Sequence, residues 1–439
     1  MIRLFLLLFS LLDFCLVPCG GITKSDKTVK AVQKTDSCKL DSKNTYEVYL
    51  PPMGNSTQKF PLLVIIDAHG SGKFSLDKFK PAAKQYPTLL IASNLIKNGF
   101  EGSQGAIRTL IDDVRQKYPV SKTVFMTGFS GGARMALEYG LTSQLNGLIL
   151  CGALANPDQI KQQRCPVISV SGMDDFNFIE TAQYLFQEQL TPGNLKIELT
   201  SDNHNWPDSL TLTNALGLLS LSSQPLNISL TTQSQIKIYC QRQLTRINSL
   251  KQRKDFVKAA LVARNMSSTE PFRSDETFAI EYRELKANPE YMNQMKRLEK
   301  CLQLEISMRS PYVDDFQTKD TIWWKNEIKI TAEKINAQQD SYTRDMYRRI
   351  KGFWGIVSYS LCKQALKEHN ALVLSKTLAI YRMLEPENPD MFYFSAFPYF
   401  WKGNNVATLS MVKRALKAGF LDRGQLKKDF PDSITSKLF

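Results

Sequence analysis

The chain has 439 residues, is 43% hydrophobic and 22% charged, and carries a formal net charge of +14. This length predicts two or three domains, and the composition is that of a globular protein able to bury cores. The basic excess lies mainly from residue 241 onward, where 34 Lys and Arg face 23 Asp and Glu. These residues are scattered and form no long run, so we expect a solvated basic surface and no nucleic-acid partner.

The N-terminal residues 1–21 predict a secretory signal. One arginine precedes an apolar stretch of signal-peptide length, and small residues follow. The stretch is short and is interrupted by Asp13, so an uncleaved membrane anchor is the weaker alternative. Cys19 precedes two glycines, so attachment to a membrane through a lipidated Cys19 is a further alternative, although Pro18 replaces the usual small residue. We therefore expect an exported protein: periplasmic, secreted or lipid-anchored at the membrane surface.

Residues 22–43 are polar and predict a linker, and residues 44–234 predict a domain with a parallel sheet. In that domain "TYEVYLPP" is typical of an edge strand that ends in prolines. A continuous apolar run follows at 60–68, as in a strand buried on both faces, and further strands are predicted at 88–93, 122–128, 145–153, 165–172 and 195–201. Helical segments separate most of them, at 76–86 (interrupted by Pro81), 105–118, 133–141 and 179–190. This alternation predicts an α/β fold, a doubly wound, mostly parallel sheet covered by helices.

Residues 235–439 predict an all-α domain, because long helical stretches appear there with little β signal. Near the end, "YFWKGNNVATLSMVKRALKAGF" has Gly403 at an expected turn and Ala415 twelve residues later. This pattern resembles a tetratricopeptide repeat, in which paired helices touch at an alanine. The resemblance covers one or two units, and an unrelated helical bundle explains the same residues. Either form offers a surface for a protein partner.

The cysteines and glycines give no sign of a metal or cofactor site. Two of the eight cysteines, Cys15 and Cys19, fall in the predicted signal, and the other six are widely spaced with no metal-ligand pattern. Cys151 ends one predicted strand and Cys165 begins the next parallel one, so they are expected at opposite edges of the sheet, without a disulfide. No phosphate-binding glycine loop or dinucleotide motif is present. We expect no metal and no cofactor.

The stretch "GFSGG" at 128–132 places Ser130 between a predicted strand and a predicted helix. A glycine two residues before and two after a serine is typical of a nucleophile elbow, a tight turn that exposes the hydroxyl at the carboxyl edge of the sheet. Side chains at Gly128 or Gly132 would collide with the neighbouring strand and helix. The helix that follows directs its first N–H groups at the same space, where they stabilise negative charge.

A serine nucleophile needs a base and an acid, and the chain has only three histidines. His69, in "DAHGSGK", lies where a loop of this fold donates an oxyanion N–H, and is expected to structure that loop. His369 lies in a helical stretch and is expected on a helix surface. His204 directly follows the last predicted strand and is the only good base. The acid is expected after the penultimate strand, where the sequence offers Asp174 and Asp175; the usual spacing from the glycine favours Asp175.

Residues 45 to 220 resemble an α/β-hydrolase, nearest to exported esterases of the polyhydroxybutyrate-depolymerase and feruloyl-esterase type. The resemblance rests on "HGSG" at 69–72, "GFSGG" at 128–132, "GMDD" at 172–175 and "HNWP" at 204–207. It implies Ser130 as nucleophile, Asp175 as acid and His204 as base. It also implies oxyanion donors in the backbone of Gly131 and of Ser71 or its neighbour. The loop before His204 reads "SDN", where such esterases often have glycines, and residues after 235 lie outside the family pattern.

These residues predict a serine hydrolase that cleaves a small ester or acyl substrate through an acyl-enzyme. Trp206 is a candidate wall for the substrate, with a packing role equally open, and Asn94 is a weaker candidate for a substrate contact. Lys73 is expected to be solvated unless the substrate is anionic. A peptidase or acyltransferase with the same triad is the first alternative. The second is a partner-binding helical scaffold carried on a hydrolase platform.

Overall fold

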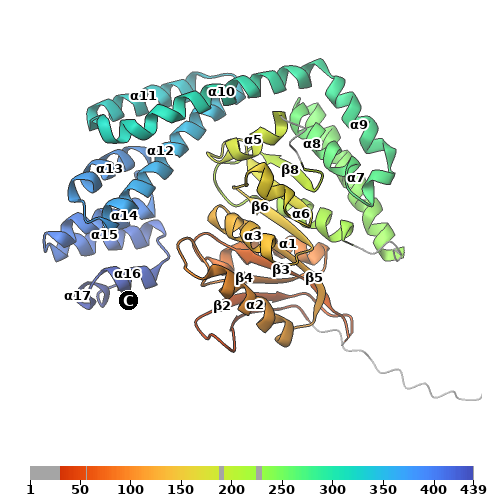
Figure 1. Cartoon of the computed structure of the whole chain (residues 1–439), viewed down its shortest axis with the longest axis horizontal. Helices are drawn as coiled ribbons and strands as arrows, with labels where there is room; N and C mark the ends of the chain where they lie inside the picture. Colours follow the sequence, from red (N-terminus) through yellow and green to blue (C-terminus); the bar gives the residue numbers. More distant parts are fainter. Residues whose placement is uncertain (1–29, 56, 187–191, 224–229, 439) are drawn as a thin grey trace, which may run out of the picture.

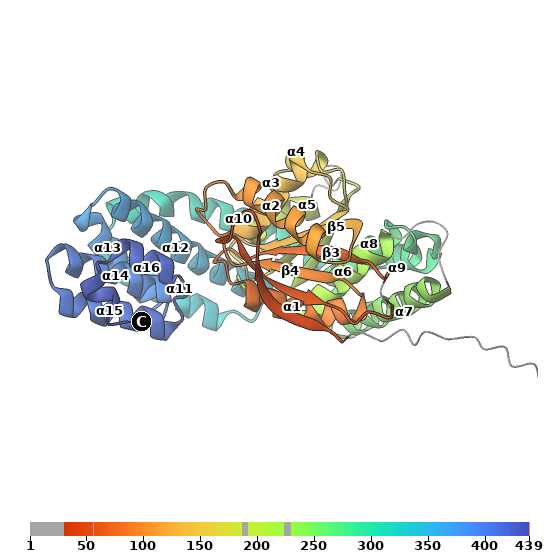
Figure 2. The same cartoon turned by 90° about the horizontal axis from the view of Figure 1, so that it is seen from below.

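The structure, a computed structural model, describes residues 30–55, 57–186, 192–223 and 230–438. The predicted signal at 1–21, with Cys19, lies outside these residues. Figure 1 shows a twisted sheet flanked by helices, and a long arch of helices that begins beside the sheet, passes over it and descends on the other side. Figure 2 shows the last helices of this arch as a separate lobe beside the sheet.

Eight strands form one sheet in the order β1-β2-β4-β3-β5-β6-β7-β8. Their bounds are Val32–Ser37 (β1), Thr45–Leu50 (β2), Phe60–Ile66 (β3), Leu89–Ser93 (β4), Val120–Phe129 (β5), Gly147–Cys151 (β6), Val167–Gly172 (β7) and Leu195–Thr200 (β8). In this order, every neighbouring pair from β4 to β8 is parallel. The pairs β1–β2 and β2–β4 are antiparallel. The apolar runs predicted as buried strands are therefore confirmed.

Helices cover both faces of this sheet, because parallel strands need crossover connections. Apolar residues of α2, α3 and α5 share a core with one face, and those of α1 and α6 share a core with the other. The bounds are Gly72–Gln85 (α1), Ser103–Lys117 (α2), Gly131–Thr142 (α3), Pro157–Lys161 (α4), Phe178–Phe186 (α5) and Ser209–Ser222 (α6). The chain has the predicted α/β-hydrolase fold, followed by helices.

Three details of the predicted sheet domain were wrong. The predicted linker contains β1, which pairs with β2 along all six of its residues, so β2 is not an edge strand. The sequence of β1, "VQKTDS", is polar because this strand lies exposed at the edge. Pro81 does not interrupt α1: its side chain is exposed, while Phe79, Ala82 and Ala83 pack into the core beneath the helix and hold it together.

The helical region begins earlier than predicted, because residue 235 falls inside α7. The helices run Leu230–Gln252 (α7), Phe256–Ser267 (α8), Glu276–Ala287 (α9), Pro289–Thr318 (α10), Thr321–Ala337 (α11), Ser341–Lys367 (α12), Ala371–Leu384 (α13), Pro389–Trp401 (α14), Asn405–Ala418 (α15), Arg423–Asp429 (α16) and Asp432–Thr435 (α17). His369 is not on a helix: it lies in the turn after α12 with a left-handed backbone and stacks on Trp401. Gly403 makes the turn between α14 and α15, and Ala415 of α15 is fully buried.

The helical region completes the sheet domain at its last strand. Asn265 of α8 accepts from the Ile197 N–H (3.2 Å) and donates to the Ile197 carbonyl (2.8 Å), so it satisfies the backbone of β8 at the middle of its free edge. Arg246 of α7 pairs with Glu198 of the same strand. An unpaired strand edge invites association with other chains, and here α7 and α8 cover it.

The six cysteines in the described part of the chain are all free thiols, and five of them are buried. Cys151 and Cys165 are among them, in agreement with the expectation that they do not pair. No helix among the described residues is long and apolar enough to span a bilayer.

Candidate active site

Ser130 sits in a strained turn at the carboxyl end of β5. Its φ of 54° and ψ of −118° lie in a region that residues with a side chain rarely adopt. A Cβ at Gly128 would lie 2.2 Å from the backbone of Gly132, and a Cβ at Gly132 would lie 2.1 Å from the carbonyl oxygen of Ile66. Only glycine fits at these two positions, because the colliding atoms are backbone. The turn thus forces α3 to start directly behind the hydroxyl.

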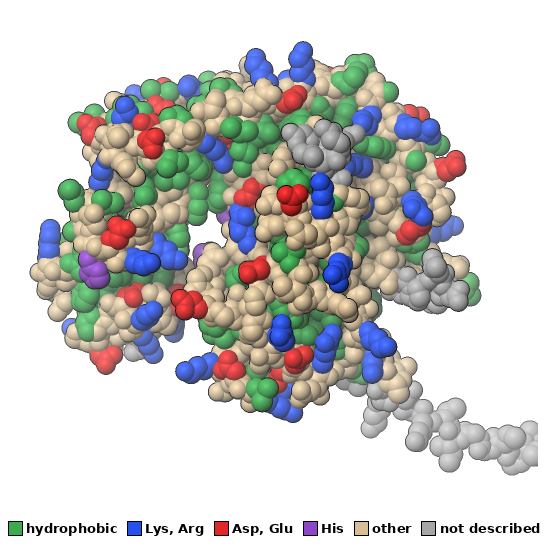
Figure 3. Space-filling view, viewed as in Figure 1, with side chains coloured by type: hydrophobic (Ala, Val, Ile, Leu, Met, Phe, Trp, Pro, Cys, Tyr) green, Lys and Arg blue, Asp and Glu red, His purple; other side chains and the backbone are tan. Residues whose placement is uncertain are grey.

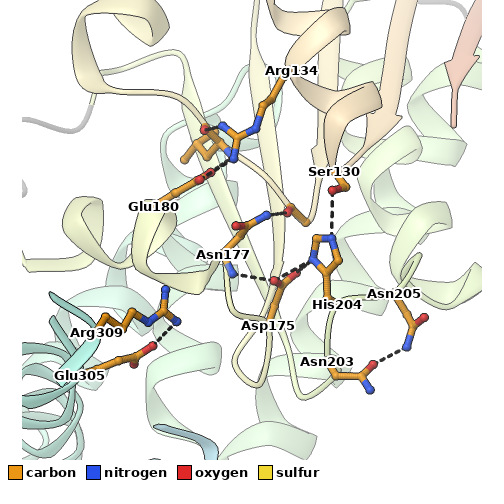
Figure 4. A network of polar contacts seen from close by, with 12 residues as sticks. Ser130, Arg134, Asp175, Asn177, Glu180, Asn203, His204, Asn205, Glu305 and Arg309 are labelled. Carbon is orange, nitrogen blue, oxygen red and sulfur yellow. Dashed lines mark hydrogen bonds and ion pairs between the residues drawn. The ribbon is translucent and has the colours of Figure 1, made fainter. Parts of the chain in front are cut away.

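A chain of hydrogen bonds joins Ser130, His204 and Asp175, as Figure 4 shows. The Oγ of Ser130 lies 2.9 Å from Nε2 of His204, and Nδ1 of His204 lies 2.8 and 2.9 Å from the two carboxylate oxygens of Asp175. With its proton on Nδ1, the imidazole donates to the carboxylate and leaves Nε2 free to accept from the hydroxyl. The three residues follow β5, β7 and β8 and meet at one edge of the sheet.

The two candidate aspartates have different surroundings, and Asp175 is the one that reaches His204. Its side chain is 1% exposed and also accepts from the backbone N–H of Asn177 at 2.7 Å. Asp174 faces Arg348 of α12 at 3.6 Å, and one of its oxygens is buried with no hydrogen bond among the described residues. Burial, together with the nearby carboxylate of Asp345, raises the pKa of Asp174 to about 6, although Arg348 acts in the opposite direction.

Two aromatic rings flank His204. The centroid of the Phe176 ring lies 4.2 Å from that of the imidazole, and the Phe129 centroid lies 4.8 Å away. These rings restrict the orientation of the imidazole and leave an apolar surface beside the Ser130 hydroxyl. Sequence reasoning did not single out either phenylalanine, although each directly neighbours a predicted triad residue.

Asp67, at the end of β3, connects the loop of Ser71 to the loop of His204. Its Oδ1 accepts from the N–H groups of His69 (2.9 Å) and Ser71 (3.1 Å), and its Oδ2 accepts from the indole N–H of Trp206 (2.7 Å). The Ser71 N–H, expected to be an oxyanion donor, is therefore occupied. Trp206 is buried and packs against Phe129, so its role here is packing and not a substrate wall. Asp67 directly follows a predicted buried strand, and this position could have indicated a polar residue at the site.

Asn94 does not contribute to the site as expected. Its amide donates to Glu47 at 3.2 Å, and its oxygen lies against Gly72, at the start of α1. The loop that begins at Asn94 instead brings Asn98 to the elbow. The Asn98 side chain lies so close to Gly131 that a Cβ there would be 1.7 Å from its oxygen. Lys73 is exposed, as expected.

The helical region holds the loop that carries the acid. Arg349 of α12 is fully buried and pairs with Glu305 of α10 at 2.5 Å. The same guanidinium donates to the carbonyl of Met173 at 2.5 Å and stacks over the ring of Phe178. Burying such a pair is costly unless its hydrogen bonds are satisfied, and here the carbonyl of the acid loop satisfies one of them. No signal in the sequence links residue 349 to this loop.

No cluster of three or more histidine, cysteine or carboxylate side chains able to hold a metal ion occurs in the part of the chain that the structure describes. The polar groups around Ser130 are an imidazole, a carboxylate and the N-terminus of α3.

No protein-family model matches the chain, and no curated protein matches it. Three solved structures that are similar to this chain match less than half of its length. An S-formylglutathione hydrolase from Agrobacterium tumefaciens is 12% identical with a TM-score of 0.36, and the match covers 45% of this chain and 98% of that one. Est1E from Butyrivibrio proteoclasticus is 15% identical (TM-score 0.34; 44% and 98% covered). XC6422 from Xanthomonas campestris, a serine hydrolase without a lid, is 17% identical (TM-score 0.34; 45% and 97% covered).

Proposed function

We propose that the protein is a serine hydrolase that cleaves carboxylic esters through an acyl-enzyme. The observation that carries this proposal is the continuous hydrogen-bonded chain from Ser130 Oγ through His204 to Asp175. The three groups stand in the order and geometry of a nucleophile, a general base and an orienting carboxylate.

In the first half of the reaction, Ser130 Oγ attacks the ester carbonyl while Nε2 of His204 takes the hydroxyl proton. Asp175 stabilises the imidazolium that forms. The N–H of Gly131, first residue of α3, has no partner within its own helix and is directed at the developing oxyanion. The Asn98 side chain, which lies against Gly131, is the candidate for the second donor role that Ser71 does not fill. His204 then gives its proton to the leaving alcohol, and the acyl group remains on Ser130.

In the second half, water attacks the acyl-enzyme carbonyl and gives a proton to His204. The tetrahedral intermediate collapses, the carboxylic acid leaves, and the proton returns from His204 to Ser130. An amine or a second alcohol in place of water would make the same site an acyltransferase, and an amide substrate would make it a peptidase. A panel of esters, peptides and acyl acceptors separates these outcomes.

The first prediction tests the nucleophile. Ser130→Ala should lower the turnover of a short aryl ester by roughly 10⁴-fold or more, because the covalent step is lost. A fluorophosphonate probe should label the protein, and peptide mapping should place the label on Ser130. Ser307→Ala, at an exposed position of α10, is the control and should keep full activity and labelling. Unchanged turnover in Ser130→Ala would remove this serine from the chemistry.

We place this activity outside the cytoplasm, in the periplasm, in the medium or at a membrane surface. The support is the signal-like sequence of residues 1–21. Expression of the full chain, followed by N-terminal sequencing of the exported product, tests the cleavage, and mass spectrometry of that product tests lipidation at Cys19.

A further inference from the structure

Helix α12 lies beyond the carboxyl edge of the sheet and approaches it at two points. At one point, Arg349 donates to the acid loop after β7, and Gly352 of the next turn packs against Phe176 of that loop. At the other point, Lys363 Nζ lies 3.5 Å from the place of a Cβ at Gly99, in the loop after β4. The helix therefore reaches from the loop after β7 to the loop after β4.

These two contacts lie on either side of the triad. Phe176 packs on His204, and Gly99 directly follows Asn98, whose side chain lies against Gly131 at the elbow. The stretch of α12 between Gly352 and Lys363, about 16 Å along an α-helix, therefore passes beside Ser130.

Ile356 lies within this stretch. It is four residues after Gly352 and seven before Lys363, and residues at these spacings lie on the same side of an α-helix, so it faces the sheet edge. Its side chain is 38% exposed and is the only exposed large hydrophobic side chain on α12, all of which the structure describes. Figure 3 shows an open space between the hydrolase part and the arch, with histidine side chains on its wall.

The arch also closes this space on a further side. Lys97, in the loop after β4, pairs with Asp422 at the start of α16. His69, in the loop after β3, faces Asp390 of α14: burial raises the pKa of the Asp390 carboxyl, and the histidine acts in the opposite direction. The sheet edge, α12 and the last helices therefore bound this space.

We propose that Ile356 is a specificity-determining residue, which contacts the apolar group of the substrate ester and limits its length. This inference rests on the proposed function, because it needs an ester bound at Ser130. Phe176, which flanks His204 and is partly exposed, supplies an apolar ring on the sheet side of the space, and Ile356 supplies an apolar side chain on the opposite wall. The apolar group is either the acyl chain or the alkyl chain of the alcohol.

The test compares chain-length profiles of the wild type, Ile356→Ala and Ile356→Trp. One series of p-nitrophenyl esters varies the acyl group from acetate to octanoate, and a second series of acetates varies the alkyl alcohol. The measured quantity is the ratio of kcat/KM for the longest ester to kcat/KM for the shortest. In one of the two series, Ile356→Ala should raise this ratio by roughly 3- to 10-fold, and Ile356→Trp should lower this ratio. Ile330→Ala is the matched control, an isoleucine of similar exposure on α11.

A second measurement does not depend on turnover. The double variant Ser130→Cys/Ile356→Cys should be joined by a short bismaleimide, and digestion should yield one crosslinked peptide pair. The thiol at 130 is well placed to react, because it stands at a helix N-terminus. Ser130→Cys/Ile330→Cys is the control and should give no such pair.

The outcomes separate this inference from the proposed function. If turnover depends on Ser130 but the profiles of all Ile356 variants coincide in both series, Ile356 does not determine specificity and the hydrolase proposal stands. If Ser130→Ala keeps full turnover, the hydrolase proposal fails, and this inference fails with it. If no ester in either series is cleaved, the crosslink decides: its absence places Ile356 away from Ser130.

Discussion

Two adjacent aspartates in the loop after β7 illustrate how strongly the surroundings of a carboxylate determine its role and its pKa. Asp175 is paired with His204, and Asp174 is buried beside Asp345 and has only a 3.6 Å contact to Arg348. A buried carboxylate with weak compensation holds its proton more tightly in the folded state than in the unfolded state. Asp174 therefore costs stability whenever it is ionised.

The second prediction follows from the pKa of Asp174, which burial raises from 3.8 to about 6. The folded state binds the proton more tightly, so the stability contributed by this group falls as pH rises from about 4 to about 6 and stays low above that. Asp174→Asn removes the effect. Its unfolding free energy should exceed that of the wild type by about 2–3 kcal/mol at pH 7–8, and the difference should vanish near pH 4.

Urea unfolding from pH 4 to pH 8 measures this difference. Asp112→Asn, at an exposed position of α2, is the control. Parallel stability curves for the wild type and Asp174→Asn would contradict the raised pKa.

At the same scale, the sequence predicted the residues with strict chemical roles better than those around them. Ser130, His204 and Asp175 each follow a buried strand, and parallel strands bring such positions to one edge, so their meeting was predictable. The roles of Ser71, Asn94 and Trp206 depended on side-chain directions within loops. Those directions are decided by hydrogen bonds to Asp67 and Glu47, which no local pattern reveals.

At the scale of elements, the strands buried on both faces were predictable from apolar runs, whereas β1 was not, because an exposed edge strand has no apolar run. The elbow between β5 and α3 shows what joins two elements tightly. Gly132 lets α3 start against the backbone of Ile66. Gly105 of α2, in contrast, has no atom within 4 Å of the place of its Cβ.

The third prediction compares these two glycines, which both lie in the first turn of a helix. Gly132→Ala should cost about 1–3 kcal/mol of folding free energy by overpacking. It should also lower kcat/KM by roughly 100-fold, because β3 and α3 are pushed apart and Ser130 is displaced. Gly105→Ala should stabilise the protein by about 0.5–1 kcal/mol without affecting activity. Thermal unfolding and ester hydrolysis measure both; equal stabilities of the two variants would refute the close packing at the elbow.

At the scale of the whole molecule, a change of pattern near residue 235 predicted a sheet domain followed by a helical domain. The two regions share a core. Apolar residues of α8, α10 and α12 belong to the same core cluster as residues of β7 and β8, and Arg349 of α12 is buried against the acid loop. These contacts link residues more than 50 and up to 176 positions apart in the chain. Local periodicity in the sequence does not reveal which distant residues pack together.

The last prediction concerns a fragment that ends at residue 223, after α6. Removing the helical region uncovers the edge of β8, which Asn265 now satisfies, and exposes apolar residues of the sheet domain that pack against α7 and α8. An exposed edge strand next to exposed apolar surface promotes association, so the fragment should be insoluble or aggregated, with no ester hydrolysis. Co-expression with residues 230–439 should restore soluble protein, and size-exclusion chromatography with an activity assay measures both. A monodisperse fragment with full activity would mean that the helical region serves recognition or location alone, and that its contacts with β8 contribute little to folding.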